Sequence, residues 1–133
     1  MKTKPIAPTP ETQLTKKEEA MKWARERLAD PNTVIVDVET TGLLNRDPQT
    51  EVVSLSMVNP QGRPILAALV NPGRPIPLDA QKIHKIEDRE VKDAPPFSVI
   101  GDLASILMAG KHIVAFNAMF DVHLLVHLMG KYN

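Results

Sequence analysis

Two acidic side chains at the end of an apolar segment are the first residues of this chain whose spacing points to chemistry. Asp37 and Glu39 lie two residues apart, and the β-branched residues of segment 33–38 predict a buried strand. Alternate residues of a strand share one face, so both carboxylates are expected on the same side of a sheet. Carboxylates held together repel each other unless a cation neutralises them, and oxygen ligands suit Mg²⁺ or Mn²⁺. The same spacing also fits two carboxylates that reach water or cap the turn at residues 40–42.

A third acid lies far along the chain. Asp121 is in the first turn of a predicted helix at 119–129, directly after a predicted strand at 113–116. If strand 113–116 pairs beside strand 33–38, the end of strand 33–38 and the start of the helix that follows strand 113–116 lie together. This is the edge at which open α/β sheets bind ligands. Three carboxylates would then share one metal site. Asp121 is equally suited to complement the dipole at the helix N-terminus, and both roles are compatible.

The elements that must position these acids follow from the apolar periodicity. Further strands are predicted at 51–58 and 65–70, and further helices at 15–29, 78–86 and 97–109. Thr15 and Glu18 are spaced as a capping box at the start of the first helix. A polar link is expected between the helices at 78–86 and 97–109. The first three strands predict an antiparallel meander. Helices alternating with strands after it predict an α/β domain with a mixed sheet flanked by helices.

Composition bounds the remaining possibilities. The 133 residues suffice for one globular core, with a proline-rich, flexible arm expected over residues 1–14 and one domain over 15–133. Lys plus Arg and Asp plus Glu both number 16, so no global positive field attracts nucleic acid. Seven Lys or Arg against four Glu give residues 1–29 a net charge of +3, which fits a phosphate contact or a solvated helix face, and leave −3 on the remainder.

Residue types exclude several other classes of protein. The chain has no cysteine, which rules out disulfides, thiolate metal sites and cysteine nucleophiles. No apolar run approaches the roughly 18–20 residues of a membrane span, so a cytoplasmic protein without a membrane partner is expected. Metal ions, if bound, must be held by oxygen or imidazole.

Three segments in order resemble a known enzyme family. Asp37-Val38-Glu39-Thr40-Thr41-Gly42-Leu43 resembles the first motif of the DEDD exonuclease superfamily, in the branch of the DNA polymerase III epsilon proofreading subunit and ribonuclease T. Residues 71–77, with 83–86 and 94–97, are similar to the segment that joins the first and second motifs there. Asn117-Ala118-Met119-Phe120-Asp121 resembles the second motif.

The resemblance implies a ribonuclease H-like fold and a 3′–5′ exonuclease that hydrolyses terminal phosphodiesters with two Mg²⁺ or Mn²⁺ ions. Carried over, Asp37 would bridge both ions, Glu39 would hold one and touch the terminal ribose, and Asp121 would bind one through water. The implied substrate is the 3′ end of single-stranded DNA, although these motifs do not distinguish DNA from RNA. The implied substrate-binding residues are Thr40, Thr41, Gly42, Leu43, Ile83, His84, Phe116 and Asn117.

One family motif has no match in this chain. The third motif supplies a final metal-binding Asp and a His that acts as general base, and the residues after Asp121 contain no acid. His123 lies about 200° round the helix from Asp121 and is expected to point away from it, and His127 shares the face of His123. We therefore expect an incomplete metal site, a sheet lacking its final strand and helix, and very low activity of this chain alone.

The missing final elements have a consequence for packing. A set of apolar residues at helical spacing is predicted to form core, and part of that surface would lack its cover, which predicts a homodimer or other association, or marginal stability. The set comprises Leu103, Ile106, Leu107, Met108, Met119, Leu124, Leu125, Leu128 and Met129. A truncated product, a disrupted gene, or a polymerase or second chain that completes the fold would each account for the missing motif.

Two other functions remain open on these residues. The same scaffold fits a non-catalytic module that binds nucleic acid or a replication partner, for which metal binding would be weak. A phosphatase with an aspartyl nucleophile is a weaker candidate, because the lysine and second acidic motif of that chemistry are not found in order.

Overall fold

In this computed structural model, the described part of the chain is residue 7 and residues 10–132, without the side chains of residues 11–14. The elements are α1 (Pro10–Ala29), β1 (Thr33–Thr40), β2 (Val52–Val58), β3 (Pro64–Leu69), α2 (Leu78–His84), α3 (Asp88–Val91), α4 (Phe97–Met108), β4 (His112–Val114) and α5 (Ala118–Tyr132).

The four strands form one mixed sheet in the order β3-β2-β1-β4. β1 pairs antiparallel with β2, and β2 pairs antiparallel with β3, which confirms the predicted meander. β4 pairs parallel with β1 on the other side, with Thr33 opposite His112 and Ile35 opposite Val114. The predicted mixed α/β sheet is therefore confirmed, with β1 as an inner strand.

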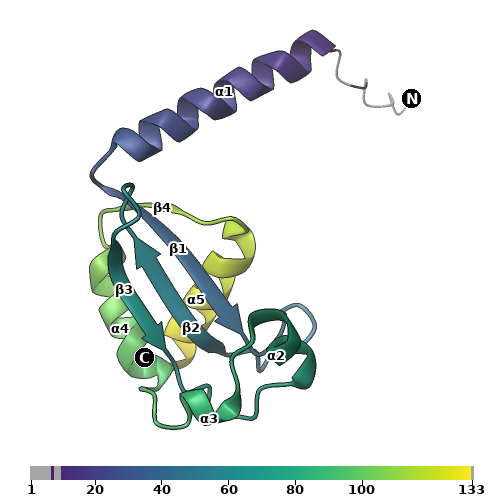
Figure 1. Cartoon of the computed structure of the whole chain (residues 1–133), viewed down its shortest axis with the longest axis vertical. Coiled ribbons are helices and arrows are strands. Elements are labelled where there is room, and N and C mark those ends of the chain that lie inside the picture. The colour runs from purple at the N-terminus through teal and green to yellow at the C-terminus, as the bar shows by residue number, and fades with distance from the viewer. Residues whose placement is uncertain (1–6, 8–9, 133) are drawn as a thin grey trace.

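The main core lies between one face of the sheet and helices α4 and α5, which run behind the sheet in Figure 1. Val34, Val36 and Val38 of β1 are buried in that core together with Leu124 and Leu128 of α5. A smaller apolar cluster, which includes Val53, Ile76, Ala80 and Val91, joins β2 to α2 and α3. Figure 1 shows α2 and α3 together at the end of the sheet where β1 finishes.

The first helix differs from its prediction. α1 begins at Pro10, so Thr15 and Glu18 lie inside it and the predicted capping box at its start was wrong. Proline is well tolerated at a helix start because it has no N–H to leave unpaired. Residues 10–14 of the predicted arm are therefore helical, whereas residues 1–6, 8 and 9 lie outside the described residues. α1 projects from the rest of the molecule in Figure 1.

Three later elements also differ from their predictions. The predicted polar link contains α3, whose start has a capping box between Glu87 and Glu90, a signal that the apolar pattern overlooked. α5 does not end at Gly130 but continues to Tyr132, and Lys131 and Tyr132 both donate hydrogen bonds to Glu51. β4 covers His112–Val114 rather than 113–116, and Phe116 is fully exposed in the following loop.

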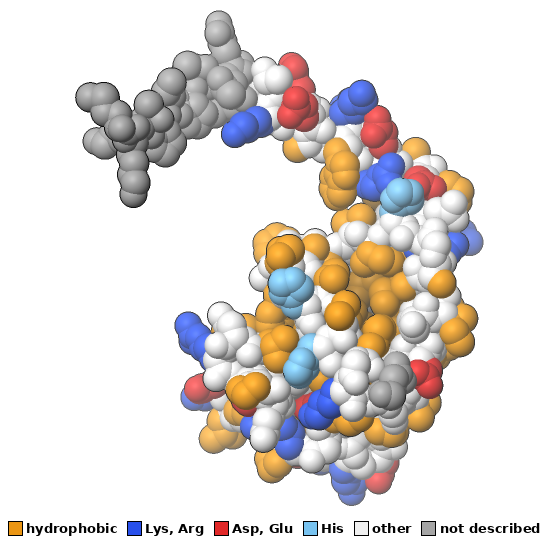
Figure 2. All heavy atoms as spheres, turned by 180° about the vertical axis from the view of Figure 1, so that it is seen from behind, with side chains coloured by type: hydrophobic (Ala, Val, Ile, Leu, Met, Phe, Trp, Pro, Cys, Tyr) orange, Lys and Arg blue, Asp and Glu red, His pale blue; other side chains and the backbone are white. Residues whose placement is uncertain are grey.

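The apolar residues of α4 and α5 divide into buried and exposed sets. Leu124, Leu125 and Leu128 are buried, and Leu107, Met108 and Met129 pack partly buried against them, as predicted. Leu103, Ile106 and Met119 are exposed, so their assignment to the core was wrong. Figure 2 shows the molecule from behind relative to Figure 1. On this side, hydrophobic side chains gather around a hollow. None of the helices in the described residues is long and apolar enough to cross a bilayer.

We expect the exposed apolar side chains of α4 and α5 to cause concentration-dependent self-association. Ile106 is 74% exposed, and burying such a side chain contributes about 1.5–3 kcal/mol. Ile106→Lys should therefore weaken association about tenfold or more in sedimentation velocity over a range of concentrations. Ser105→Lys, at an exposed polar position of the same helix, is the control, and equal effects of both changes would contradict the expectation.

Two helical glycines should respond oppositely to alanine. At Gly101 a Cβ would lie 2.7 Å from the Phe97 ring, so Gly101→Ala should destabilise the protein by about 1–3 kcal/mol despite the better helix propensity of alanine. At Gly130 a Cβ meets nothing within 4 Å, so Gly130→Ala should stabilise it by about 0.5–1 kcal/mol. Urea unfolding measures both, and the same sign for the two would refute the packing argument.

Candidate active site

The candidate site begins on the face of β1 that turns away from the main core. Strict alternation along the strand buries Val36 and Val38 and leaves Asp37 exposed and Glu39 partly exposed. On the neighbouring strand, Ser56 lies opposite Asp37 and Ser54 lies opposite Glu39. These small neighbours leave the two carboxylates uncovered. The predicted placement of both acids on one face of the sheet is thus what the structure shows.

Asp121 joins this pair through electrostatics. It lies in the first turn of α5, is 6% exposed, and donates its backbone N–H to the Asn117 carbonyl at 3.0 Å. Burial raises the pKa of the Asp121 carboxyl, and the negative charges of Asp37 and Glu39 raise it further. The parallel pairing of β4 with β1 therefore brings the third acid within electrostatic reach of the first two, from more than 80 residues away in sequence.

The donor chemistry of these residues fits a hard divalent cation. All three groups are carboxylates, whose oxygens suit Mg²⁺ or Mn²⁺, and a cation would relieve the repulsion that raises the pKa of Asp121. Within the described residues, no three His, Asp or Glu side chains are grouped closely enough to hold a metal ion by themselves. The three acids are thus near one another without forming a closed ligand set.

His84 supports the end of β1. Its Nε2 lies 3.1 Å from the Thr40 carbonyl, and its Nδ1 accepts the Ile86 N–H at 3.1 Å. Because Nδ1 is an acceptor there, Nε2 carries the proton and donates a hydrogen bond to the Thr40 carbonyl. The Thr40 hydroxyl in turn donates to the Gly42 carbonyl at 2.7 Å. His84 therefore lies beside the first motif and hydrogen-bonds to its backbone.

Thr41 has a supporting position rather than an accessible one. It is 2% exposed, its N–H donates to the Glu51 carbonyl at 2.9 Å, and its Oγ1 accepts the Glu51 N–H at 3.0 Å. Both polar groups of this residue are thus used inside the protein. The Thr41 side chain is therefore not available for the substrate contact that the resemblance implied.

The loop after the first motif is fixed by an ion pair. Arg74 donates to Asp47 Oδ2 at 2.7 Å and to the Gln49 carbonyl at 2.8 Å. A hydrogen bond from the Gln49 N–H and the contact with Arg74 hold the pKa of Asp47 below its usual value. The backbone N–H of Asp47 donates to the Leu43 carbonyl at 2.9 Å, so Arg74 helps to fix the loop that carries Leu43.

A pocket of about 540 Å³ opens between this loop and the start of α5. It brings together Leu43 and Asn117, two of the predicted substrate-binding residues, with Phe120 and His123. The helical angle from Asp121 predicted only that His123 points away from the acids. It did not anticipate that the loop at residues 43–45 folds against that side of α5, which makes His123 part of the pocket wall.

Three of the predicted substrate-binding residues lie on the surface. Phe116 and Asn117 are exposed in the loop before α5, and Ile83 is exposed on α2, one residue before His84. Gly42 is partly buried, and a Cβ there would meet only Thr50 Oγ1 at 3.7 Å. The side chains of Ile83, Phe116 and Asn117 are thus accessible, whereas that of Thr41 is not.

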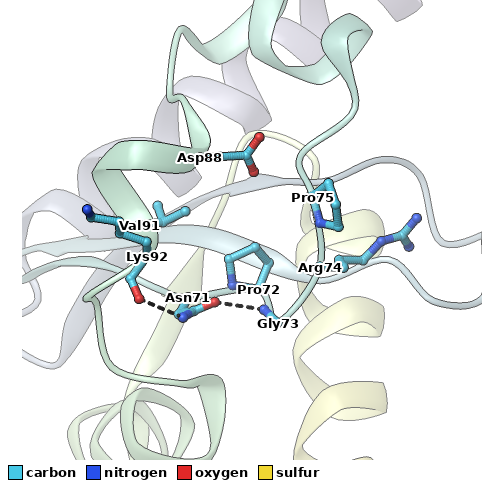
Figure 3. Close-up of a pocket in the computed structure, with 8 residues that line it drawn as sticks. All are labelled: Asn71, Pro72, Gly73, Arg74, Pro75, Asp88, Val91 and Lys92. Atoms are coloured by element: carbon cyan, nitrogen blue, oxygen red, sulfur yellow. Dashed lines mark hydrogen bonds between the residues drawn. The ribbon is translucent and has the colours of Figure 1, made fainter.

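A separate pocket of about 390 Å³ lies between the loop at residues 71–75 and α3 (Figure 3). Two of its polar side chains are used inside the protein, because Asn71 Nδ2 donates to the Lys92 carbonyl at 3.1 Å and Asp88 Oδ1 accepts the Ile76 N–H at 2.8 Å. Arg74 points away from its other residues in Figure 3, toward the ion pair with Asp47. None of the predicted site residues lines this pocket.

The mixed sheet with acids at the end of β1 and the start of α5 is the ribonuclease H-like arrangement that the motifs implied. A protein-family model described as exonuclease, RNase_T, matches residues 34–132, which include all three acids. The chain belongs to this family of exonucleases, within the DEDD superfamily of 3′–5′ exonucleases.

Curated relatives support this assignment. The chain is 32% identical over 114 residues to an uncharacterized exonuclease, CP81, of Escherichia phage 186, with 86% of this chain and 55% of the relative covered. It is 36% identical over 98 residues to the DNA polymerase III subunit epsilon of Rickettsia felis, with 71% of this chain and 42% of the relative covered. The chain thus spans about half the length of these relatives.

A solved structure agrees with the fold. The chain resembles exonuclease X in complex with 5′ overhanging duplex DNA, with a TM-score of 0.53 and 31% sequence identity. The match covers 69% of this chain and 52% of the other. Enzymes of the DEDD superfamily generally use divalent metal ions, which agrees with the acidic site.

Asp121 gives the metal-free protein a testable pH dependence. Because folding raises its pKa above the usual 3.8, the folded state binds more protons, and stability falls as pH rises through the raised value. With EDTA at pH 7, Asp121→Asn should therefore unfold at a higher urea concentration than the wild type. The difference should vanish below about pH 3.8, where both states are protonated.

The control for this prediction is Asp102→Asn, which changes an exposed acid on α4. It should leave the urea midpoint unchanged at both pH values. Mn²⁺ should stabilise the wild type more than Asp121→Asn, because the cation offsets the repulsion. A variant that is less stable than the wild type throughout the pH range would contradict the electrostatic account.

Proposed function

We propose that this chain is a metal-dependent 3′–5′ exonuclease domain that hydrolyses terminal phosphodiesters of DNA. The observation that carries the proposal is the raised pKa of Asp121, caused by burial and by the two acids of the first motif. A buried carboxyl whose pKa is raised by two neighbouring acids is typical of functional sites, because a fold does not otherwise gain from such repulsion. Membership of the exonuclease family supports the same reaction class.

Asp37, Glu39 and Asp121 would hold Mg²⁺ or Mn²⁺. Bound ions in such a site activate the attacking water and stabilise the leaving oxygen. The carboxylates therefore serve as ligands rather than as nucleophiles. Because no residue of this chain matches the third family motif, we infer that the chain by itself cleaves slowly.

The proposed substrate is the 3′ end of a single DNA strand. The exposed Phe116 ring offers a surface on which a base can stack, and Asn117 and Leu43 line the pocket beside it. A polymerase is the proposed partner class, because several relatives are named as DNA polymerase III epsilon subunits. RNA is the alternative substrate for the same site.

Cleavage is tested with a 5′-labelled single-stranded DNA oligonucleotide under single-turnover conditions with Mn²⁺. We expect slow shortening from the 3′ end, and a rate about 100-fold or more lower for Asp37→Ala because a metal ligand is lost. Asp79→Ala, an exposed acid on α2, is the matched control and should retain the wild-type rate. An RNA oligonucleotide of the same sequence measures substrate preference.

Three outcomes would change the proposal. Cleavage that survives Asp37→Ala would show that these carboxylates are not the catalytic ligands. Fast cleavage by the wild type that Asp37→Ala abolishes would overturn the inference of low activity. Oligonucleotide binding without cleavage or Mn²⁺ binding, unchanged by Asp37→Ala in calorimetry, would instead indicate a non-catalytic binding module.

A further inference from the structure

Glu51 is a buried acid that the proposed chemistry does not use. It directly precedes β2 and is 4% exposed. Its Oε1 accepts hydrogen bonds from Lys131 Nζ at 2.6 Å and from the Tyr132 hydroxyl at 2.8 Å. A buried carboxylate is costly unless it is paired and hydrogen-bonded, and these two donors supply both. The last turn of α5 is thereby tied to the start of β2.

The backbone of Glu51 is tied to the first motif. Its N–H donates to Thr41 Oγ1 and its carbonyl accepts the Thr41 N–H, at 3.0 and 2.9 Å. Thr41 lies two residues after Glu39 and directly follows the end of β1. One residue therefore links the strand end that carries two of the acids to the helix that carries the third.

The rest of α5 is held mainly by apolar contacts. Leu124, Leu125 and Leu128 are buried in the core, and such contacts are non-directional, so they permit small rotations and shifts of a helix. Among the hydrogen bonds given by the described residues, those of Lys131 and Tyr132 are the ones that join α5 to another element. The Tyr132 ring also contacts the Phe97 ring of α4 at 6.2 Å.

The helix transmits this constraint to its other end. Asp121 and Lys131 are ten residues apart on one continuous helix, about 15 Å along its axis. A rotation released at the last turn therefore also moves the first turn. We propose that Glu51 is a positioning residue, which clamps the last turn of α5 to β2 and thereby sets where Asp121 lies relative to Asp37 and Glu39.

The surroundings of the clamp argue against a ligand site at the same place. A pocket of about 440 Å³ beside it is lined by Arg74, Lys131 and His127. The two cations, Arg74 and Lys131, are already paired, Arg74 with Asp47 and Lys131 with Glu51. The hydrogen bond with Glu51 is the main cause that raises the pKa of Lys131, which agrees with a committed pair. The pocket is therefore a poor receptor for an anion.

The test compares three variants of the clamp, Glu51→Gln, Lys131→Met and Tyr132→Phe, with a core variant on α4, Ile100→Val. Ile100→Val serves as the control once its thermal stability is shown to match that of one clamp variant. Mn²⁺ affinity is measured by calorimetry well below the melting temperature. Glu51→Gln should weaken Mn²⁺ binding by about tenfold or more, and the two partner variants by less. Ile100→Val should keep the wild-type affinity. Unchanged affinity in Glu51→Gln would overturn the positioning role.

A second measurement separates this inference from the proposed function on which it rests. Residual dipolar couplings of the metal-free protein compare the orientation of α5 with that of β1 and β2. Glu51→Gln should change the couplings of α5, including those at residues 118–121, and Ile100→Val should not. Unaltered couplings in Glu51→Gln refute the clamp, whether or not the wild type binds Mn²⁺. Mn²⁺ binding that does not depend on Asp121 refutes the proposed function alone.

Discussion

The parallel pairing of β4 with β1 is the contact on which the candidate site depends. Three residue pairs, from Thr33 with His112 to Ile35 with Val114, place the end of β4 alongside β1. The chain then turns directly into α5, whose first turn carries Asp121 within electrostatic reach of Asp37 and Glu39. Without this pairing, Asp121 would not lie close enough to Asp37 and Glu39 for their charges to raise its pKa. The electrostatics of the site therefore follow from a short stretch of sheet.

Holding the acids together has a cost that the rest of the fold must offset. Desolvation and like charge both disfavour the ionised form of Asp121. The apolar core between the sheet and α5 supplies the opposing free energy, through residues such as Val36, Leu55 and Leu124. Polar ties at Glu51 and His84 then restrict how α5 and the end of β1 can relax. Perturbed carboxyl groups of this kind cluster at functional sites.

The accuracy of the sequence predictions depended on the range of the interactions involved. Alternation in segment 33–38 predicted the face of Asp37, because a strand imposes a period of two on its own side chains. The helical period failed for Ile106 and Met119, because their exposure depends on which elements cover α4 and α5. The end of α5 was missed for the same reason, since Lys131 and Tyr132 are held by Glu51, some 80 residues away. The capping box of α3 was a local signal that a search for apolar residues overlooked.

The sequence by itself determined the family, the order of the strands along the chain and the acidic residues, because motifs, period and residue type are local properties. The tertiary structure decided which of those residues meet. It buried Thr41, which the motif had placed against substrate, and it brought His123 into a pocket with Leu43. It also gave the buried Glu51 two partners on α5. These outcomes depend on how distant segments pack, and a linear pattern carries no information on the distance between side chains that only the folded chain brings together.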